Sequence, residues 1–400
     1  MSLKVCVCGG GNGAHTLSGL SASREGVEVR VLTLFADEAE RWTKAMEEVG
    51  GLTVLVTEKD GTTTEIKSKP HIVTKDPKIA VTGADVIILT VPAFAHEGYF
   101  KAMVPYIQDS ALLVGLPGQA GFEFQCRDIL GTKAAAISIL TFETLPWACR
   151  IKEFGKVVEV LGTKAVIAAA LVKGTAETKD PLSTLQMLLG AEPKLRLAKH
   201  FLEMLIMNHS FIHPCIMNGE WKNWDGKPVA QPPLFYQGIS KEVANMLMSC
   251  SDECEAVAKA IMAASPKDDL SDVKSIYQWY CEYYGEDIVD NRDQYHCMRT
   301  NKSYKGLVHP TKAVEGGFVP DFTNRYLTED VPMGVVVFKG LALAAGVPTP
   351  NHDKLIYWAQ EKIGKEYLVN GQLTGKDVAS TRCPQRYGFN TLSAILTGKN

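Results

Sequence analysis

The side chains best suited to proton transfer in this chain lie in two short segments. His213 lies within residues 211–214, where bulky apolar neighbours would make an unpartnered imidazole costly to bury. An imidazole has an unperturbed pKa of about 6.5, so it can donate or accept a proton near neutral pH. The segment 324–330 adds Arg325, which can grip a carboxylate through two hydrogen bonds, and Asp330, which can orient an imidazole. These residue types indicate acid–base chemistry on an anionic molecule; a satisfied core histidine is the alternative for His213.

A glycine-rich loop follows the first apolar run of the chain. Residues 9–14 read Gly-Gly-Gly-Asn-Gly-Ala, and apolar residues then return with helical spacing. Gly9, Gly11 and Ala14 fit the G-x-G-x-x-G/A pattern, which provides a tight turn, a close approach for a pyrophosphate and close packing of helix on strand. Asn12 and Gly13 fall at the positive end of the helix, where phosphates are held. The pattern predicts a dinucleotide site, with a structural turn as the alternative.

The end of the second expected strand bears on which dinucleotide binds. Residues 27–33 alternate with period two, but no acidic residue stands where the adenosine ribose is usually bonded. The first charges are Asp37 and Glu38, and residues 32–39 contain no Arg or Lys. A 2′-phosphate would be poorly received there, so the sequence favours NAD(H) over NADP(H) and leaves the ribose contact open. Asp37 can equally be the N-cap of the next helix.

The loop after the next buried strand is expected over the cofactor. Residues 85–91 form a near-continuous apolar run, which is typical of a parallel strand buried on both faces. The run ends at Pro92, and ligands in open parallel sheets bind beyond the carboxyl ends of the strands. Pro92 is therefore a predicted cofactor contact, while His96 is expected at a helix start and facing solvent.

Two further loops on the same edge carry candidate substrate contacts. The strand at 111–116 leads to Gln119, and the strand at 135–140 leads to Glu143 and Thr144. An amide, a carboxylate and a hydroxyl can orient a small polar molecule. Ordinary loop and capping polarity is the alternative.

The composition of the chain changes near residues 173–181, where Gly, Thr and charged residues replace the apolar runs. Alternating strands and helices before this point predict an α/β fold, a Rossmann-type doubly wound sheet in a domain of residues 1–198. A hairpin at 52–67 and an Ala-rich helix at 163–172 are expected within it. Residues 199–400 are predicted to form a mostly α-helical domain. The expected helices around and after the boundary are 195–207, 241–264, 273–284, 332–345 and 355–363.

Composition narrows the class of protein. A net charge of −3 over 400 residues gives no electrostatic reason to expect a nucleic acid or a membrane surface as partner. The sequence enters a core strand at once and holds no apolar run of about 18 residues, so a cytoplasmic protein is expected. The ten cysteines are too sparse for a disulfide scaffold, and their spacing matches no zinc site. Reduced thiols and no bound metal are expected.

Seven segments together resemble the opine dehydrogenases of marine invertebrates. They read GGGNGAHTLSGL, VLTLFADEAERW, TVPAFAHEGYF, FETLPWACRIKEF, TNKSYKGLVHP, NRYLTEDVPMG and RCPQRYGFNTL. The likeness covers almost the whole chain, and the motifs after residue 110 are more specific than the glycine loop. It implies an enzyme that uses NADH to condense pyruvate with an amino acid reductively and also catalyses the reverse oxidation.

The resemblance extends to single positions of the expected site. His213, Arg325 and Asp330 match the family's catalytic set, and Gln119 and Thr144 match positions that hold pyruvate. The positions matched near the amino-acid substrate are Glu143, Cys149 and Trp279.

One departure from the family pattern lies just before His213, where Asn208-His209-Ser210 replaces an expected Ser-Tyr-Ser. Loss of an aromatic wall there can change the choice of amino acid. Glu143 favours L-arginine because it can meet a guanidinium, but a carboxylate also binds an α-ammonium group. Alanine, glycine, β-alanine and taurine therefore stay open.

Two rival functions also remain. One is an NAD-linked hydroxy-acid or polyol-phosphate dehydrogenase, and the other is a nucleotide-sensing protein without chemistry. The expected partners are small molecules only, and the expected state is a monomer.

Overall fold

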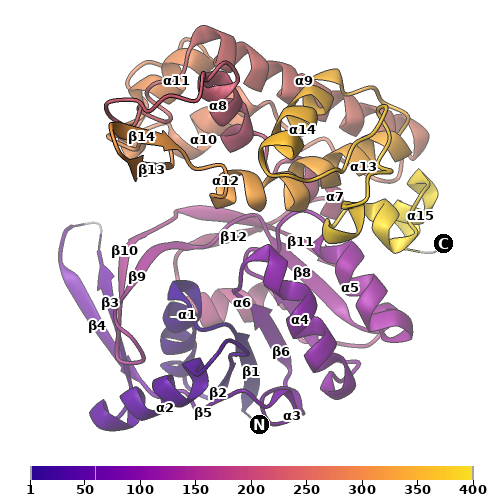
Figure 1. Ribbon diagram of the computed structural model, residues 1–400. Coiled ribbons are helices and arrows are strands. Elements are labelled where there is room, and N and C mark those ends of the chain that lie inside the picture. Colours follow the sequence, from indigo (N-terminus) through magenta and orange to yellow (C-terminus); the bar gives the residue numbers. More distant parts are fainter. Residues whose placement is uncertain (1, 59, 399–400) are drawn as a thin grey trace. The chain divides into compact units, whose positions relative to one another are not determined.

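The computed structural model describes residues 2–58 and 60–398 and divides into two compact units (Figure 1). The division falls between Met204 and Leu205. The boundary predicted from the sequence came earlier, after residue 198. The N-terminal unit is α/β and the C-terminal unit is mostly helical, as predicted.

An eight-stranded sheet forms the centre of the N-terminal unit, in the order β12-β11-β8-β7-β6-β1-β2-β5. The neighbours β2, β1, β6, β7 and β8 pair in parallel, whereas β11 runs antiparallel to β8. This order has the reversal about β1 that is typical of a doubly wound dinucleotide-binding sheet. The strands are β1 (Leu3–Cys8), β2 (Val27–Leu32), β5 (Ile72–Thr74), β6 (Val86–Leu89), β7 (Leu112–Gly115), β8 (Ser138–Phe142), β11 (Val166–Val172) and β12 (Lys194–Leu197).

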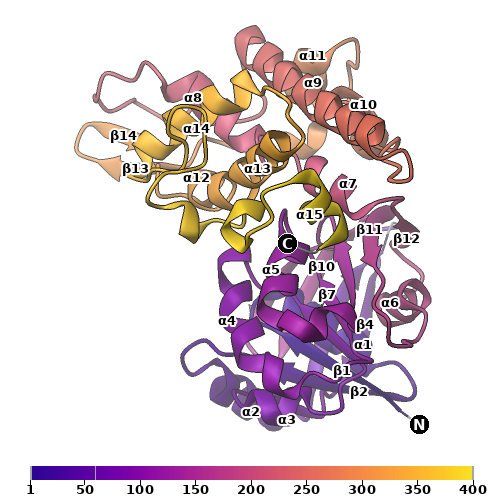
Figure 2. The same ribbon diagram turned by 90° about the vertical axis from the view of Figure 1, so that its right-hand side faces the viewer.

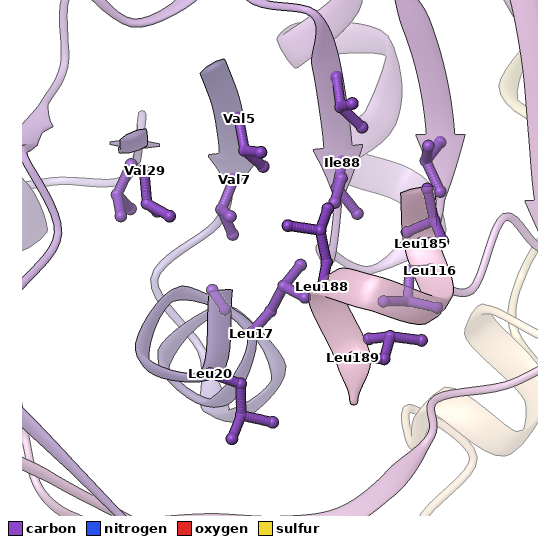
Figure 3. Packing of buried hydrophobic residues seen from close by; sticks show 14 of the residues in the cluster. Val5, Val7, Leu17, Leu20, Val29, Ile88, Leu116, Leu185, Leu188 and Leu189 are labelled. Atoms are coloured by element: carbon purple, nitrogen blue, oxygen red, sulfur yellow. The ribbon is translucent and has the colours of Figure 1, made fainter. Parts of the chain in front are cut away.

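Helices cover both faces of this sheet because its strands are apolar on both sides. Val5 and Val7 of β1 pack under the helices α1 and α6, as Figure 3 shows for Leu17 and Leu188. Cys6 of β1 lies in a second apolar cluster, under α3, α4 and α5. Such burial on both faces is typical of parallel strands. The helices of this unit are α1 (Asn12–Ala22), α2 (Glu38–Val49), α3 (Pro77–Val81), α4 (Ala93–Met103), α5 (Phe122–Leu130) and α6 (Pro181–Leu189), with 3₁₀ turns at Val104–Tyr106 and Gly131–Ala135; α7 (Phe201–Ile206) crosses the division.

A second sheet of four strands lies on the other side of α1, in the order β4-β3-β10-β9. The predicted hairpin at 52–67 is present, but it joins β9 and β10 instead of the main sheet. Helix α1 packs against all four strands of this sheet as well as against β1 and β2. The helix that follows the glycine loop is thus held on both sides. The strands are β3 (Leu52–Thr57), β4 (Thr63–Ser68), β9 (Trp147–Glu153) and β10 (Val157–Thr163).

One predicted helix is wrong and another is wrong in part. Residues 166–172 form β11, and the first part of the predicted helix 195–207 is β12, whereas α7 occupies 201–206. Ile167 and Ala169 are fully buried, and β11 pairs with β8 on one side and β12 on the other. Small side chains fit this tightly packed layer, so packing overrides the helix propensity of alanine.

Helices dominate the C-terminal unit. The longest, α9, begins after Ser240, whose hydroxyl accepts the N–H of Val243 at 3.2 Å. Its buried face packs against α8, α10, α11 and α14, and Figure 2 shows α10 and α11 along it. The helices are α8 (Ile212–Trp221), α9 (Lys241–Ala264), α10 (Ile276–Tyr284), α11 (Gln294–Thr300), α12 (Arg325–Thr328), α13 (Val336–Ala344), α14 (Pro350–Lys362) and α15 (Leu392–Thr397). The shorter elements are a π-helical turn (Val331–Val335), 3₁₀ turns (Lys302–Tyr304, Val378–Ser380, Pro384–Tyr387) and the hairpin β13 (Thr311–Val314) and β14 (Gly317–Pro320).

All ten cysteines are free thiols, and every one except Cys281 is buried. Within residues 2–58 and 60–398, no helix is long and apolar enough to cross a membrane.

Candidate active site

The glycine loop has the geometry that its sequence pattern requires. Gly9 has a φ of +128°, and a Cβ there would come within 2.9 Å of Val91 Cγ1, so only glycine fits. Helix α1 begins at Asn12 with Gly11 as its N-cap, and a Cβ at Gly11 would meet no atom within 4 Å. The loop therefore leaves open space beside the positive end of α1, where a pyrophosphate can approach the backbone.

Two side chains tie this loop to β9 and to the turn that follows it. Asn12 Oδ1 accepts the N–H of Ile151 at 2.8 Å, so this oxygen is committed to the fold. His15 Nε2 accepts the N–H of Gly155 at 3.0 Å, which leaves Nδ1–H to donate to the carbonyl of Gly11 at 3.1 Å. Burial lowers the pKa of His15 to about 4, and its ring stacks on Trp42 at 3.6 Å between centroids. A neutral imidazole thus braces the turn, a contact that the sequence did not predict.

The carboxylate of Glu38 lies against the glycine loop. Its Oε2 accepts the hydroxyl proton of Thr33 at 2.5 Å, and a Cβ at Gly10 would collide with the same oxygen. Asp37 is the N-cap residue of α2, as the sequence suggested, but its side chain makes no capping hydrogen bond and instead accepts one from Arg41 Nε at 2.9 Å. The usual ribose-binding acid is absent from the strand end, but an acid reaches the loop from the first residue of α2.

The loop after β6 lies beside the same turn. Both the backbone N–H and the hydroxyl of Thr90 donate to the carbonyl of Cys8, at 3.0 and 2.9 Å. Pro92 follows as the residue before α4. His96 is fully buried rather than facing solvent, with Nε2 3.0 Å from the carbonyl of Val91 and its ring nearly perpendicular to that of Phe122. That prediction is wrong because α4 packs against α5 and turns His96 inward.

The two substrate loops predicted from the sequence lie together. The N–H of Gly118 donates to the carbonyl of Phe142 at 3.2 Å, which joins the loop after β7 to the end of β8. Gln119 has a φ of +63°, a conformation that non-glycine residues adopt rarely and that clusters at functional sites. Leu145 packs on the glycine loop, since a Cβ at Gly13 would lie 3.2 Å from it. One edge of the N-terminal unit thus holds both loops and the glycine turn.

Lys164 holds the second of these loops. Its Nζ donates to the carbonyl of Leu145 at 2.8 Å and to the hydroxyl of Thr144 at 3.3 Å. Burial lowers the pKa of Lys164, while the nearby Glu143 opposes the shift. Glu143 Oε1 accepts the N–H of Ala168 at 2.8 Å. The only hint of this lysine in the sequence is that it is the single charged residue within 160–172.

The thiol of Cys149 faces helix α1. It lies in the apolar core of the N-terminal unit, and burial raises its pKa, while a hydrogen bond from Thr16 acts in the other direction. Its contact with an amino-acid substrate stays a prediction.

In the C-terminal unit, the structure brings His213 and Asp330 together. His213, in the first turn of α8, has Nδ1 2.6 Å from Asp330 Oδ2, and its Nε2 lies 2.7 Å from the hydroxyl of Tyr236. The ring of Tyr326 stacks on the imidazole at 3.9 Å and 12°. The His213 side chain is 27% exposed, so it is not an enclosed core histidine. An imidazole held by a carboxylate and open to solvent is suited to acid–base catalysis.

Arg325 lies one turn from Asp330, at the start of α12. The side chain of Asn324 accepts the N–H of Tyr326 at 3.0 Å and sets the start of this helix. The Arg325 guanidinium bonds Glu329 Oε2 at 3.0 Å and is 66% exposed. A bidentate cation therefore lies at the surface beside the His213 cluster and can meet an anion.

His209 and Trp279 form a separate aromatic contact in the same unit. Their ring centroids are 4.9 Å apart, and neither His209 Nδ1 nor Trp279 Nε1 has a hydrogen-bond partner among the described residues. His209 is 6% exposed, has a φ of +50°, and has its pKa lowered by burial to about 3. A neutral imidazole thus takes the place of the expected aromatic wall. Across residues 2–58 and 60–398, no group of three or more His, Cys, Asp or Glu side chains is arranged to hold a metal ion.

The chain is similar to proteins of a known family. Residues 197–363 match the family model of the NAD/NADP octopine/nopaline dehydrogenase α-helical domain. An octopine dehydrogenase of Mizuhopecten yessoensis is 76% identical over 399 residues, covering 100% of both chains. Two solved octopine dehydrogenase structures, described with NADH and L-arginine and with NADH and pyruvate, have TM-scores of 0.97 and 0.94. Their identities are 75% and 73%, and each match covers 100% of this chain and 99% of the other. The chain belongs to the opine dehydrogenase family.

Proposed function

We propose that the protein is an octopine dehydrogenase. In this reaction, pyruvate, L-arginine, NADH and a proton give octopine, NAD⁺ and water, and the enzyme also catalyses the reverse oxidation. The observation that carries the proposal is the His213–Asp330 pair beside Arg325, in a chain 76% identical to an octopine dehydrogenase over its full length. L-arginine is preferred over the other amines because a solved octopine dehydrogenase that is 75% identical to this chain is described with NADH and L-arginine.

The proposed catalytic residues are three side chains of the C-terminal unit. Arg325 binds a substrate carboxylate through its guanidinium. His213 donates a proton to the carbonyl oxygen of pyruvate as the amine attacks. A second proton, given up by the amine nitrogen, then lets this oxygen leave as water and the imine form. In the oxidation, His213 takes a proton back. Asp330 accepts a hydrogen bond from Nδ1–H of His213 and so keeps Nε2 as the nitrogen that exchanges protons.

NADH supplies the hydride when it is bound, and the N-terminal unit holds it. The pyrophosphate is bound by the turn of Gly9, Gly11 and Gly13, and Ala14 allows the close packing behind it. The backbone of Asn12 contributes at the helix start, and Pro92 lies against the cofactor. We assign the ribose contact to Glu38, whose carboxylate lies against Gly10. Because a carboxylate repels a 2′-phosphate, this position favours NAD(H).

The substrate contacts follow from the carboxyl-edge loops. Gln119 and Thr144 hold pyruvate, and their two loops are joined by the Gly118–Phe142 bond. Trp279 packs against the amino-acid substrate. Glu143 and Cys149 also bind the amino-acid substrate. Within the fold, Glu143 already accepts a hydrogen bond from Ala168, and Cys149 already has one from Thr16.

We further infer a cytoplasmic monomer. Ten free thiols fit a reducing compartment. The apolar face of α9, the longest helix, is covered by other helices of its own unit. Light scattering coupled to size-exclusion chromatography tests the monomer, and a dimer mass would refute it.

One assay tests the activity. Purified protein is given pyruvate and NADH, with and without L-arginine, alanine, glycine, β-alanine or taurine. NADH oxidation that requires L-arginine is expected. Equal oxidation without any amine would indicate a hydroxy-acid dehydrogenase, and preference for another amine would reassign the substrate. Binding of NADH without oxidation under any amine would indicate a sensor.

A further inference from the structure

We propose that Tyr236 is a positioning residue for His213, a role that rests on the proposed function. The imidazole has two nitrogens, and the structure accounts for both of them. Asp330 Oδ2 lies 2.6 Å from Nδ1, and the Tyr236 hydroxyl lies 2.7 Å from Nε2. With Tyr326 stacked on one face, the ring is held in one orientation.

A hydroxyl is the group that can keep this contact through a proton-transfer cycle. Asp330 accepts from Nδ1–H, so Nε2 is the nitrogen whose protonation changes. A neutral Nε2 accepts the Tyr236 O–H, and a protonated Nε2–H donates to the Tyr236 oxygen. A carboxylate could only accept and an ammonium could only donate. Burial raises the pKa of Tyr236, so the phenol stays protonated and keeps both roles.

The surrounding rings hold Tyr236 in place. Tyr236 is 8% exposed and stacks on Tyr304, with centroids 3.9 Å apart and planes at 15°. The hydroxyl of Tyr304 does not reach His213 and instead donates to the hydroxyl of Tyr280 at 3.2 Å. The proton that reaches substrate must leave Nε2, either past the Tyr236 hydroxyl or through it. In both routes the imidazole starts from the orientation that Tyr236 sets.

The test compares Tyr236→Phe with Tyr304→Phe in the full-length protein. Both variants keep the stacked rings and lose one hydroxyl, but only the first hydroxyl bonds His213. Tyr236→Phe should lower kcat by about 3- to 10-fold, with little change in KM or in NADH affinity. Tyr304→Phe should keep the wild-type kcat.

The pH profile separates positioning from simple packing. His213 is faced by Asp330, Tyr236 and Tyr326, with Arg325 on the same helix as Tyr326. Hydrogen bonds to charged groups are stronger than those between neutral groups, so Tyr236 stabilises the imidazolium more than the imidazole. In Tyr236→Phe, the condensation reaction should therefore lose activity at a lower pH than in the wild-type enzyme. Equal kcat and equal profiles in wild type and Tyr236→Phe would overturn the proposal, as would equal losses in both variants.

A measurement that needs neither turnover nor a stable variant completes the test. In NMR spectra of the wild-type protein, nuclear Overhauser contacts between the ring protons of His213 and Tyr236 are expected. Their absence would refute the role of Tyr236 even in an active enzyme. Their presence in a protein that shows no arginine-dependent NADH oxidation would refute the proposed function while keeping the contact.

Discussion

His213 Nδ1 and Asp330 Oδ2 lie 2.6 Å apart, although 117 residues of sequence separate them. The carboxylate can only accept when ionised, so it selects the tautomer that carries its proton on Nδ1. Nε2 is then the nitrogen available for exchange with the substrate. This contact supports the proposed roles of Asp330 in orienting the imidazole and of His213 in proton transfer.

The first prediction concerns this pair. Asp330→Asn should lower kcat by at least about 10³-fold, because an amide can stabilise the wrong imidazole tautomer; the equivalent change in a serine protease costs about 10⁴-fold. His213→Ala should abolish turnover. NADH affinity, measured by fluorescence titration, should stay unchanged in both. Near-normal kcat in either variant would remove that residue from the catalytic set.

The second prediction concerns cofactor choice. Glu38→Gln should raise the KM for NADH, and Glu38→Arg should shift the ratio of kcat/KM values for NADH and NADPH by about 10-fold or more toward NADPH. Asp37→Asn is the matched control, because its carboxylate bonds Arg41 instead of lying on the glycine loop. An unchanged ratio in Glu38→Arg would place ribose recognition elsewhere.

The third prediction concerns the loop that contains Thr144. Lys164→Met removes the bonds to Thr144 and Leu145, so the KM for pyruvate should rise by about 10-fold as the loop loses its anchor. Lys152→Met removes an exposed lysine of β9 that pairs with Glu159, and its kinetics should match wild type. Steady-state kinetics with pyruvate varied at saturating L-arginine makes the comparison. Equal KM values in the two variants would exclude an anchoring role for Lys164.

The fourth prediction concerns stability against pH. Burial lowers the pKa of His15 from about 6.5 to about 4, so the unfolded chain binds a proton that the folded chain refuses between these values. The contribution of His15 to the free energy of unfolding is complete above about pH 6.5. It falls by about 3 kcal/mol as the pH drops toward 4. His15→Gln should unfold with a correspondingly flatter pH dependence in urea titrations, and His71→Gln, which changes an exposed histidine, should follow wild type. Parallel curves for His15→Gln and wild type would contradict this assignment.

Much of the fold could be predicted from local patterns. The turn at Gly9 and the apolar runs of β1 and β6 are sufficient to indicate a parallel sheet that binds a dinucleotide. The strand β11 was missed because alanine has a high helix propensity, and its strand conformation depends on pairing with β8 and β12. His96 was misplaced because the burial of a helix face depends on which helix packs against it.

In the candidate site, too, some residues could be predicted from the sequence and others could not. His213 could be found from its residue type and neighbours, and its catalytic role from the resemblance to a family. The contacts of Glu38, Lys164 and Tyr236 join segments that are distant or loop-bound, so no spacing in the sequence marks them. Lys164 bonds Thr144 and Tyr236 bonds His213, two residues that the sequence predicted.

The most direct test of the central claim follows the hydride into the product. The enzyme is supplied with pyruvate, L-arginine and NADH deuterated at the transferred position, and the products are analysed by mass spectrometry. Octopine dehydrogenase activity should place one deuterium in a product that contains the atoms of both L-arginine and pyruvate, less one water. Deuterated lactate, with L-arginine unchanged, would exclude this activity.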